Sequence, residues 1–157
     1  MKTASRYTVA LFLAVALGFG VSSTLVEIPL RSSHAFGLML VEAQVNGRPA
    51  VLILDTGSNR TMVNSKLVDV ATPSLRDVVT SKKGSGWSGN AVFTRASLAV
   101  GSVVWRDHVI LAMDTGEISK SLGENVDGLL GMDFLNDFDL VVVDLRQHKL
   151  ILTHSPK

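Results

Sequence analysis

One aspartate in this chain of 157 residues has a setting that suits catalysis. Asp55 follows the apolar run 51–54 and precedes Thr56, Gly57 and Ser58. A strand with this ending presents a carboxylate on a tight loop, because glycine permits close backbone approach and the two hydroxyl groups can fix the loop. The same residue types are common in ordinary turns. The tripeptide alone therefore fits either a catalytic acid or a turn aspartate.

Two other segments distinguish this aspartate from a second copy of the tripeptide. Asp-Thr-Gly recurs at residues 114–116, where Glu117 takes the place that Ser58 has in the first copy and no apolar strand follows. After the first copy come a glycine-rich turn at 84–90 and the run Leu129-Leu130-Gly131. We interpret Asp114 as the aspartate of a strand-ending turn whose loop could still line a cleft.

Taken together, residues 54–58, 84–90 and 127–131 resemble the retropepsin-like aspartic proteases, and the resemblance covers roughly 35–153. It implies that Asp55 is the catalytic residue and that Thr56, Gly57 and Ser58 support its loop. It also implies a flap over the substrate and a second strand beside the catalytic loop. The flap residues would be Gly84, Gly86, Trp87 and Gly89, and the second strand would carry Leu129, Leu130 and Gly131.

The mechanism that the resemblance implies needs two carboxylates. They share one proton and hold a water; one acts as base toward the water while the protonated one polarises the scissile carbonyl. The expected activity is hydrolysis of peptide bonds in a peptide or protein substrate. No cofactor and no metal are needed. The four histidines have no ligand-like spacing, which agrees with the absence of a metal site.

The chain supplies one well-placed aspartate, so the second must come from elsewhere. The residues left for folding are too few for two lobes with separate cores, and a C2 homodimer would set Asp55 opposite its own copy. In such dimers, the resemblance implies, Thr56 braces the partner's loop. A third reading pairs Asp55 with Asp114 inside one chain. The alternative from another class is a non-catalytic module that binds extended peptides on the same barrel.

The rest of the chain predicts strands and turns. Short apolar, β-branched runs recur about every ten residues, which is typical of a sandwich or closed barrel. We expect an all-β fold: a closed six-stranded-type acid protease barrel with one or two short helices. Expected strands are 37–45, 48–54, 61–63, 75–81, 91–100, 103–113, 138–144 and 149–153. Asn64 is expected to cap a brief helix to about Val70, whereas 114–125 is expected to be a polar loop.

The N-terminus has the pattern of a secretory leader. Lys2 and Arg6 precede the apolar stretch 9–21, which is too short to cross a bilayer as a helix. We expect a signal peptide at 1–23, an N-terminal extension at 24–36 and the protease domain at 37–154. Export to a bacterial periplasm or the medium follows, with no stable membrane anchor after cleavage.

Composition excludes several other functions. The chain has 15 Lys and Arg against 14 Asp and Glu, with two of the basic residues in the leader, so nucleic-acid binding has no electrostatic basis. The absence of cysteine excludes disulfides, thiolate metal sites and thiol nucleophiles. An apolar content of 46% and a charged content of 18% exclude a disordered body.

Overall fold

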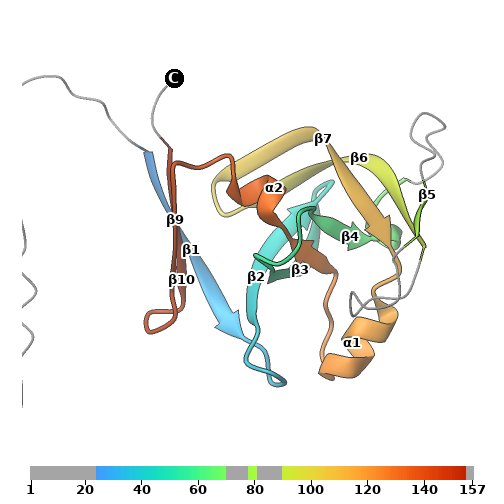
Figure 1. Cartoon of the computed structure of the whole chain (residues 1–157), viewed down its shortest axis with the longest axis horizontal. Helices are drawn as coiled ribbons and strands as arrows, with labels where there is room; N and C mark the ends of the chain where they lie inside the picture. Colours follow the sequence, from blue (N-terminus) through green and yellow to red (C-terminus); the bar gives the residue numbers. More distant parts are fainter. Residues whose placement is uncertain (1–23, 70–77, 81–89, 155–157) are drawn as a thin grey trace, which may run out of the picture.

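The computed structural model describes residues 24–69, 78–80 and 90–154 of the chain. These residues contain ten strands and three short helices (Figure 1). No helix in these ranges is long and apolar enough to cross a membrane. The strands are β1 (Thr24–Ser32), β2 (Met39–Val45), β3 (Arg48–Leu54), β4 (Met62–Asn64), β5 (Val78–Thr80), β6 (Asn90–Val100), β7 (Val103–Met113), β8 (Gly128–Leu130), β9 (Leu140–Asp144) and β10 (Lys149–His154). The helices are η1 (Ser65–Leu67), α1 (Gly116–Leu122) and α2 (Met132–Leu135).

Six of the strands close into a barrel. They follow one another in the order β6–β7–β4–β8–β3–β2, and β2 pairs with β6 to complete the ring. β5 adds to β6, while β1, β10 and β9 extend the sheet beyond β2. The prediction of a mostly-β fold with a closed six-stranded barrel and short helices is confirmed.

Local sequence explains the hairpin that leads to Asp55. Asn46 and Gly47 have φ angles of 50° and 77°, which is the left-handed geometry that an Asn-Gly turn adopts at low cost. Side chains then alternate along β2, where Val41, Ala43 and Val45 are buried in the barrel core. This alternation fixes the register of β2 against β3, because a slip of one residue would turn the apolar side chains outward.

The strand β8 runs through the middle of the barrel wall. It pairs in parallel with β3 and antiparallel with β4, so it separates the two strands that flank the loop after Asp55. Gly131 makes this crossing possible, because a Cβ atom on it would lie 2.5 Å from the carbonyl carbon of Arg60. No side chain fits at that separation.

The structure corrects one prediction about secondary structure. Residues 116–122, expected as part of a loop, form α1, and Gly123 ends it in the left-handed conformation with φ 66°. Only Ile118 and Leu122 of this helix pack against a hydrophobic cluster, on the outer face of β2, β3 and β8. A helix of seven residues is held by such packing and not by its own propensity, which is why a mostly polar sequence concealed it.

The N-terminal range 24–36, expected to be an extension, contains β1. This strand pairs with β10 over Thr24–Pro29 and with β2 over Leu30–Ser32. Ile28 and Leu30 are buried in the barrel core with Leu150 and Leu152 of β10. β1 is therefore an integral part of the fold in the described residues.

Replacement of Gly131 by alanine should destabilise the fold, because the added methyl group meets backbone atoms that cannot move aside. We expect a loss of about 3 kcal/mol in the free energy of unfolding, measured by urea denaturation. Gly123→Ala is the control: it has open space but a φ of 66°, so a loss of about 1 kcal/mol is expected. Equal stabilities for the Gly131 variant and the wild type would contradict this packing argument.

Candidate active site

The loop after β3 holds the Asp55 carboxylate in a fixed, half-buried position. The amide of Asp55 donates to the carbonyl of Leu130 at 3.0 Å, which continues the β3–β8 pairing by one residue. The Gly57 amide donates to Asp55 Oδ1 at 2.9 Å, and the Ser58 amide donates to the Asp55 carbonyl at 3.2 Å. A Cβ on Gly57 would stand 3.1 Å from Asp55 Oδ1, so glycine leaves the carboxylate room.

The other end of the loop is fixed by Ser58. Its hydroxyl donates to the carbonyl of Arg60 at 2.8 Å, within the turn itself. Its carbonyl accepts from the amide of Met132 at 2.8 Å, at the start of α2. The loop is therefore hydrogen-bonded to β8 at Asp55 and to the segment that follows β8 at Ser58.

Leu129 and Leu130 point to opposite sides of the sheet, as neighbours on a strand do. Leu130 is fully buried in the barrel core, and Leu129 is buried in the outer cluster beneath α1. Both side chains are thus packed, while the backbone between them pairs with β3 and β4. The structure brings Leu129, Leu130 and Gly131 to the Asp55 loop through main-chain contacts.

A polar pair that the sequence did not reveal, the buried Thr61 and the half-buried Asp133, joins the end of the Asp55 loop to α2. Thr61 is 0% exposed, and its hydroxyl donates to Asp133 Oδ1 at 2.7 Å and accepts from the Gly131 amide at 3.1 Å. The Thr61 amide also donates to the Asp133 carboxylate at 2.8 Å. An acid two residues after the Leu-Leu-Gly run was the signal that could have pointed to it.

The second Asp-Thr-Gly copy repeats the turn of the first but in other surroundings. The Gly116 amide donates to Asp114 Oδ1 at 2.8 Å, which matches the bond between Gly57 and Asp55. Thr115, however, is 1% exposed and its hydroxyl accepts from Asn64 Nδ2 at 2.7 Å. Thr56 is exposed. The two copies therefore differ at the threonine, which is buried in the second copy and exposed in the first.

Strand register separates Asp55 from Asp114. Asp55 follows Leu54, which pairs with Leu130 at the carboxyl end of β8. Asp114 follows Met113, which pairs with Asn64, and the Asn64 amide donates to the carbonyl of Asp127 at the opposite end of β8. Three residues of strand span about 10 Å, and β4 and β7 add their lateral spacing. The two aspartates therefore lie at opposite ends of β8.

The expected flap residues Gly84, Gly86, Trp87 and Gly89 lie outside the described residues. On either side of them, β5 and β6 pair antiparallel from Val78 opposite Val92 to Thr80 opposite Asn90.

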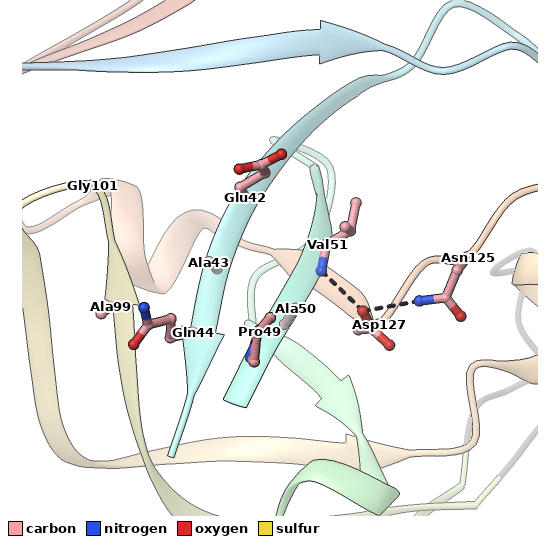
Figure 2. A pocket seen from close by; sticks show the side chains of 10 residues that line it. All are labelled: Glu42, Ala43, Gln44, Pro49, Ala50, Val51, Ala99, Gly101, Asn125 and Asp127. Carbon is pink, nitrogen blue, oxygen red and sulfur yellow. Dashed lines mark hydrogen bonds between the residues drawn. The ribbon is translucent and has the colours of Figure 1, made fainter. Parts of the chain in front are cut away.

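A hollow of about 740 Å³ lies on the outer face of β2 and β3, away from Asp55 (Figure 2). Asp127 at its rim has a structural function: its Oδ2 accepts from the Val51 amide at 3.0 Å and from Asn125 Nδ2 at 3.1 Å. The Asp127 amide in turn donates to the Val51 carbonyl at 2.7 Å. These bonds extend the β3–β8 pairing by one residue before the start of β8.

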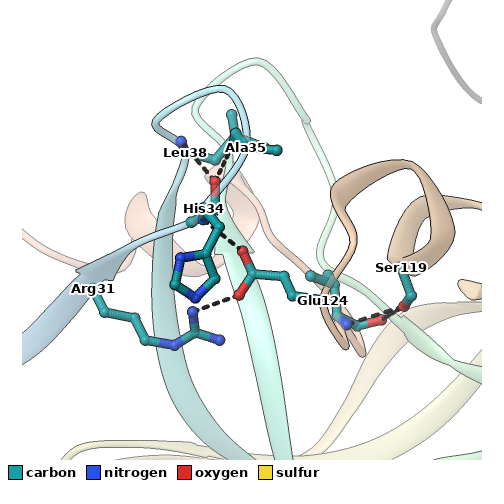
Figure 3. Close-up of polar contacts among 8 residues, drawn as sticks. Arg31, His34, Ala35, Leu38, Ser119 and Glu124 are labelled. Atoms are coloured by element: carbon teal, nitrogen blue, oxygen red, sulfur yellow. Dashed lines mark hydrogen bonds and ion pairs between the residues drawn. The ribbon is translucent and has the colours of Figure 1, made fainter.

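An ion pair joins the end of β1 to the loop before β8, and the loop between β1 and β2 adds a hydrogen bond (Figure 3). Arg31 Nη1 lies 2.6 Å from Glu124 Oε2, and the His34 amide donates to Glu124 Oε1 at 3.0 Å. The hydrogen bond from Arg31 is the main reason that the pKa of Glu124 lies below its ordinary value; desolvation opposes it. Glu124 therefore stays ionised into mildly acidic solution.

The comparisons with known proteins agree with this geometry. The model of the aspartyl protease family matches residues 41–134, more than half of the chain. The chain belongs to this family of aspartyl proteases. No curated protein sequence matches it.

One solved structure supports the fold, and two others are also similar to the chain. A retropepsin-like aspartic protease from Rickettsia conorii shares 16% identity at a TM-score of 0.50, over 90% of this chain and 100% of that chain. EIAV protease in complex with an inhibitor shares 15% identity at a TM-score of 0.43, over 68% of this chain and 93% of that one. The retroviral protease-like domain of Ddi1 from Leishmania major shares 14% identity at a TM-score of 0.46, over 76% and 94%.

Loss of the Thr61 hydroxyl should loosen the active-site loop. Thr61→Val leaves the buried Gly131 amide without its acceptor and removes one of the donors to the Asp133 carboxylate, which keeps the amides of Thr61 and Phe134. We therefore expect a loss of about 1–3 kcal/mol in unfolding free energy. Thr61→Ser keeps the hydroxyl and should recover more than half of the loss. Denaturant titration measures both, and equal losses for the two variants would show that the methyl group matters and the hydrogen bonds do not.

The Arg31–Glu124 pair should give a pH-dependent contribution to stability. Because the pKa of Glu124 is lowered in the folded state, its contribution is present above the unfolded value of about 4.3 and disappears as pH falls through the lowered folded value. Glu124→Gln should therefore lower the melting temperature at pH 7, and the difference from wild type should vanish in stronger acid. The exposed Glu117→Gln serves as control. A difference that does not change with pH would contradict this account.

Proposed function

We propose that this chain is an aspartic endopeptidase in which Asp55 is the catalytic carboxylate and a second copy of the chain supplies the other. The observation that carries the proposal is the Asp55 loop itself. β8 and α2 hold its backbone at Leu130 and Met132, while the carboxylate stays half-exposed. A rigid loop with an accessible acid is what proton transfer to and from a bound water requires.

The register of the sheet supports a second copy as the source of the other carboxylate. Asp114 lies at the far end of β8, so it cannot reach a water held by Asp55 without breaking the β4–β7 pairing. A C2 axis beside the Asp55 loop would bring two identical loops together, because each residue then meets its own copy.

The contrast between the two tripeptides also supports this arrangement. Thr115 is buried against Asn64 within its own chain, whereas Thr56 is exposed and its hydroxyl makes no hydrogen bond to a described residue. An exposed hydroxyl on a rigid loop is available to brace the loop of a partner. Thr56 would thus make a hydrogen bond between two chains, as Thr115 makes one to Asn64 within its own chain.

In the proposed dimer, the chemistry follows from the closeness of two like charges. Two carboxylates about 3 Å apart cannot both ionise at low cost, so they share one proton. The ionised Asp55 removes a proton from the water as it attacks the peptide carbonyl. The protonated Asp55 of the other copy polarises the carbonyl oxygen. The resulting tetrahedral intermediate collapses when the C–N bond breaks, and the carboxylic acid that took the proton from the water gives it to the departing amine nitrogen. Hydrolysis then needs no group beyond the two side chains and the water.

The proposal includes the cellular context and the flap. Residues 1–23 would direct export and be removed, so the mature protease acts in the periplasm or outside the cell. Gly84, Gly86, Trp87 and Gly89 would close over a bound peptide. The leader pattern and the glycine-rich sequence support these two points.

Asp55→Asn should reduce peptide cleavage at mildly acidic pH by about 10⁴-fold or more and leave the fold intact, because the amide can neither accept nor share the proton. Asp114→Asn is the matched control, since it changes the same residue in the same turn, and it should retain wild-type activity. A peptide-library digest measures both variants, with circular dichroism as the check on folding.

Two outcomes would contradict the proposal. Activity retained by the Asp55 variant, or lost only in the Asp114 variant, would remove Asp55 from the catalytic role. A wild-type protein that binds peptides as a monomer without cleaving them would favour the non-catalytic binding module on the same barrel.

A further inference from the structure

The outer face of β2 and β3 is covered by α1 at one end and open at the other. Leu40 is buried in the cluster that α1 covers, whereas Glu42 and Gln44, the next two residues of β2 on this face, are exposed. They lie opposite Val51 and Pro49 of β3. These two rows of side chains form the floor of the hollow of about 740 Å³ (Figure 2).

The walls of this hollow come from two other parts of the chain. Ala99, near the end of β6, and Gly101, in the turn to β7, line one side, and Asn125 and Asp127 line the other (Figure 2). The backbone of β2 is hydrogen-bonded to β3 on one side and to β1 and β6 on the other. A ligand in the hollow therefore meets side chains and not a free strand edge.

The hollow carries negative charge that the chain does not balance. No lysine or arginine lines it in the ranges that the structure describes. The Glu42 carboxylate and the Gln44 amide make no hydrogen bond to a described residue. The arginines of β1 and β3, Arg31 and Arg48, are bonded instead to Glu124 and to a backbone carbonyl. The hollow is therefore complementary to a cationic group.

A smaller hollow of about 320 Å³ adjoins the first. Glu42 and Gly101 line both, so the Glu42 carboxylate stands between them. Apolar residues of β1 and β2, including Pro29 and Leu40, make up most of the smaller lining. A basic side chain suits the larger hollow, and an apolar side chain suits the smaller one.

We propose that the two hollows form an exosite, a surface away from the catalytic loop that binds an extended, arginine-containing segment of the protein substrate. The guanidinium group pairs with the Glu42 carboxylate and donates to the Gln44 amide oxygen, because arginine offers several N–H donors in one planar fork. A leucine two residues away enters the smaller hollow, since alternate side chains of an extended segment share a face at about 7 Å spacing.

The position of the exosite suits a second contact with one substrate. Val51, on the floor of the hollow, precedes Asp55 by four residues of nearly continuous strand, which corresponds to about 13 Å. A substrate held at the exosite has a raised effective concentration at the Asp55 loop. The inference rests on the proposed function, since it adds a contact to the substrate of that same enzyme.

Binding is measured on the Asp55→Asn protein, so that the probe is not cleaved. The probe is the fluorescein-labelled peptide Gly-Ser-Arg-Gly-Leu-Ser-Gly, and fluorescence anisotropy gives its Kd. Glu42→Gln should raise the Kd about tenfold and Glu42→Lys about 100-fold, because the attraction to the guanidinium is first lost and then reversed. Glu117→Lys, the same change at an exposed carboxylate of α1, should leave the Kd unchanged.

Changes in the probe test the match to each hollow. A glutamate in place of the arginine should abolish binding, and a serine in place of the leucine should raise the Kd about tenfold. Added salt should weaken binding of the arginine probe, because interactions between exposed charges are screened.

The outcomes separate this inference from the proposed function. A Kd that Glu42→Lys leaves unchanged, or equal binding of the arginine and glutamate probes, would overturn the exosite and leave the protease proposal standing. A wild type that binds the arginine probe through Glu42 but cleaves no peptide would overturn the proposed function and leave the arginine site standing.

Discussion

The crossing of β8 between β3 and β4 is the constraint on which the rest of the structure depends. A single segment of backbone fixes the Asp55 amide through Leu130 and the Ser58 carbonyl through Met132. The crossing requires glycine at residue 131, where any side chain would collide with Arg60. The hydrogen bonds between the buried Thr61 and the half-buried Asp133 add a third attachment, so the Asp55 loop is held at three points. Rigidity of this kind is what a catalytic group needs to keep its geometry during proton transfer.

Some elements of the fold follow from local sequence, and others depend on partners that are distant in the chain. The Asn46-Gly47 turn and the β-branched strands on either side of it specify their geometry locally, and β3 and β7 have the predicted bounds. Residues whose structure is set by distant partners were not predictable in the same way. α1 forms because Ile118 and Leu122 cover an outer cluster, and β1 joins the fold through β10, which lies at the other end of the chain.

The residues of the candidate site also fall into two groups, those that local sequence reveals and those that matter through distant contacts. The Asp-Thr-Gly-Ser and Leu-Leu-Gly segments were recognisable because both carry several constrained residues in a row. Thr61 and Asp133 escaped notice because each is an ordinary residue whose importance comes only from a contact across 72 positions. The two Asp-Thr-Gly copies show the converse: identical residues form the same turn, yet register places them at opposite ends of β8. The local sequence defines the turn, and the topology defines which aspartate lies beside the Gly131 end of β8.

The central claim is that two Asp55 side chains from two chains act on one water, and mixing subunits tests it most directly. Wild-type protein is equilibrated with increasing amounts of the Asp55→Asn variant, and peptide cleavage per wild-type chain is measured. Our account predicts that activity falls toward zero as mixed dimers replace wild-type dimers, whereas an equal excess of Asp114→Asn causes no loss. Activity per wild-type chain that stays constant in excess Asp55→Asn would show that one chain carries the whole catalytic apparatus, and would contradict the account.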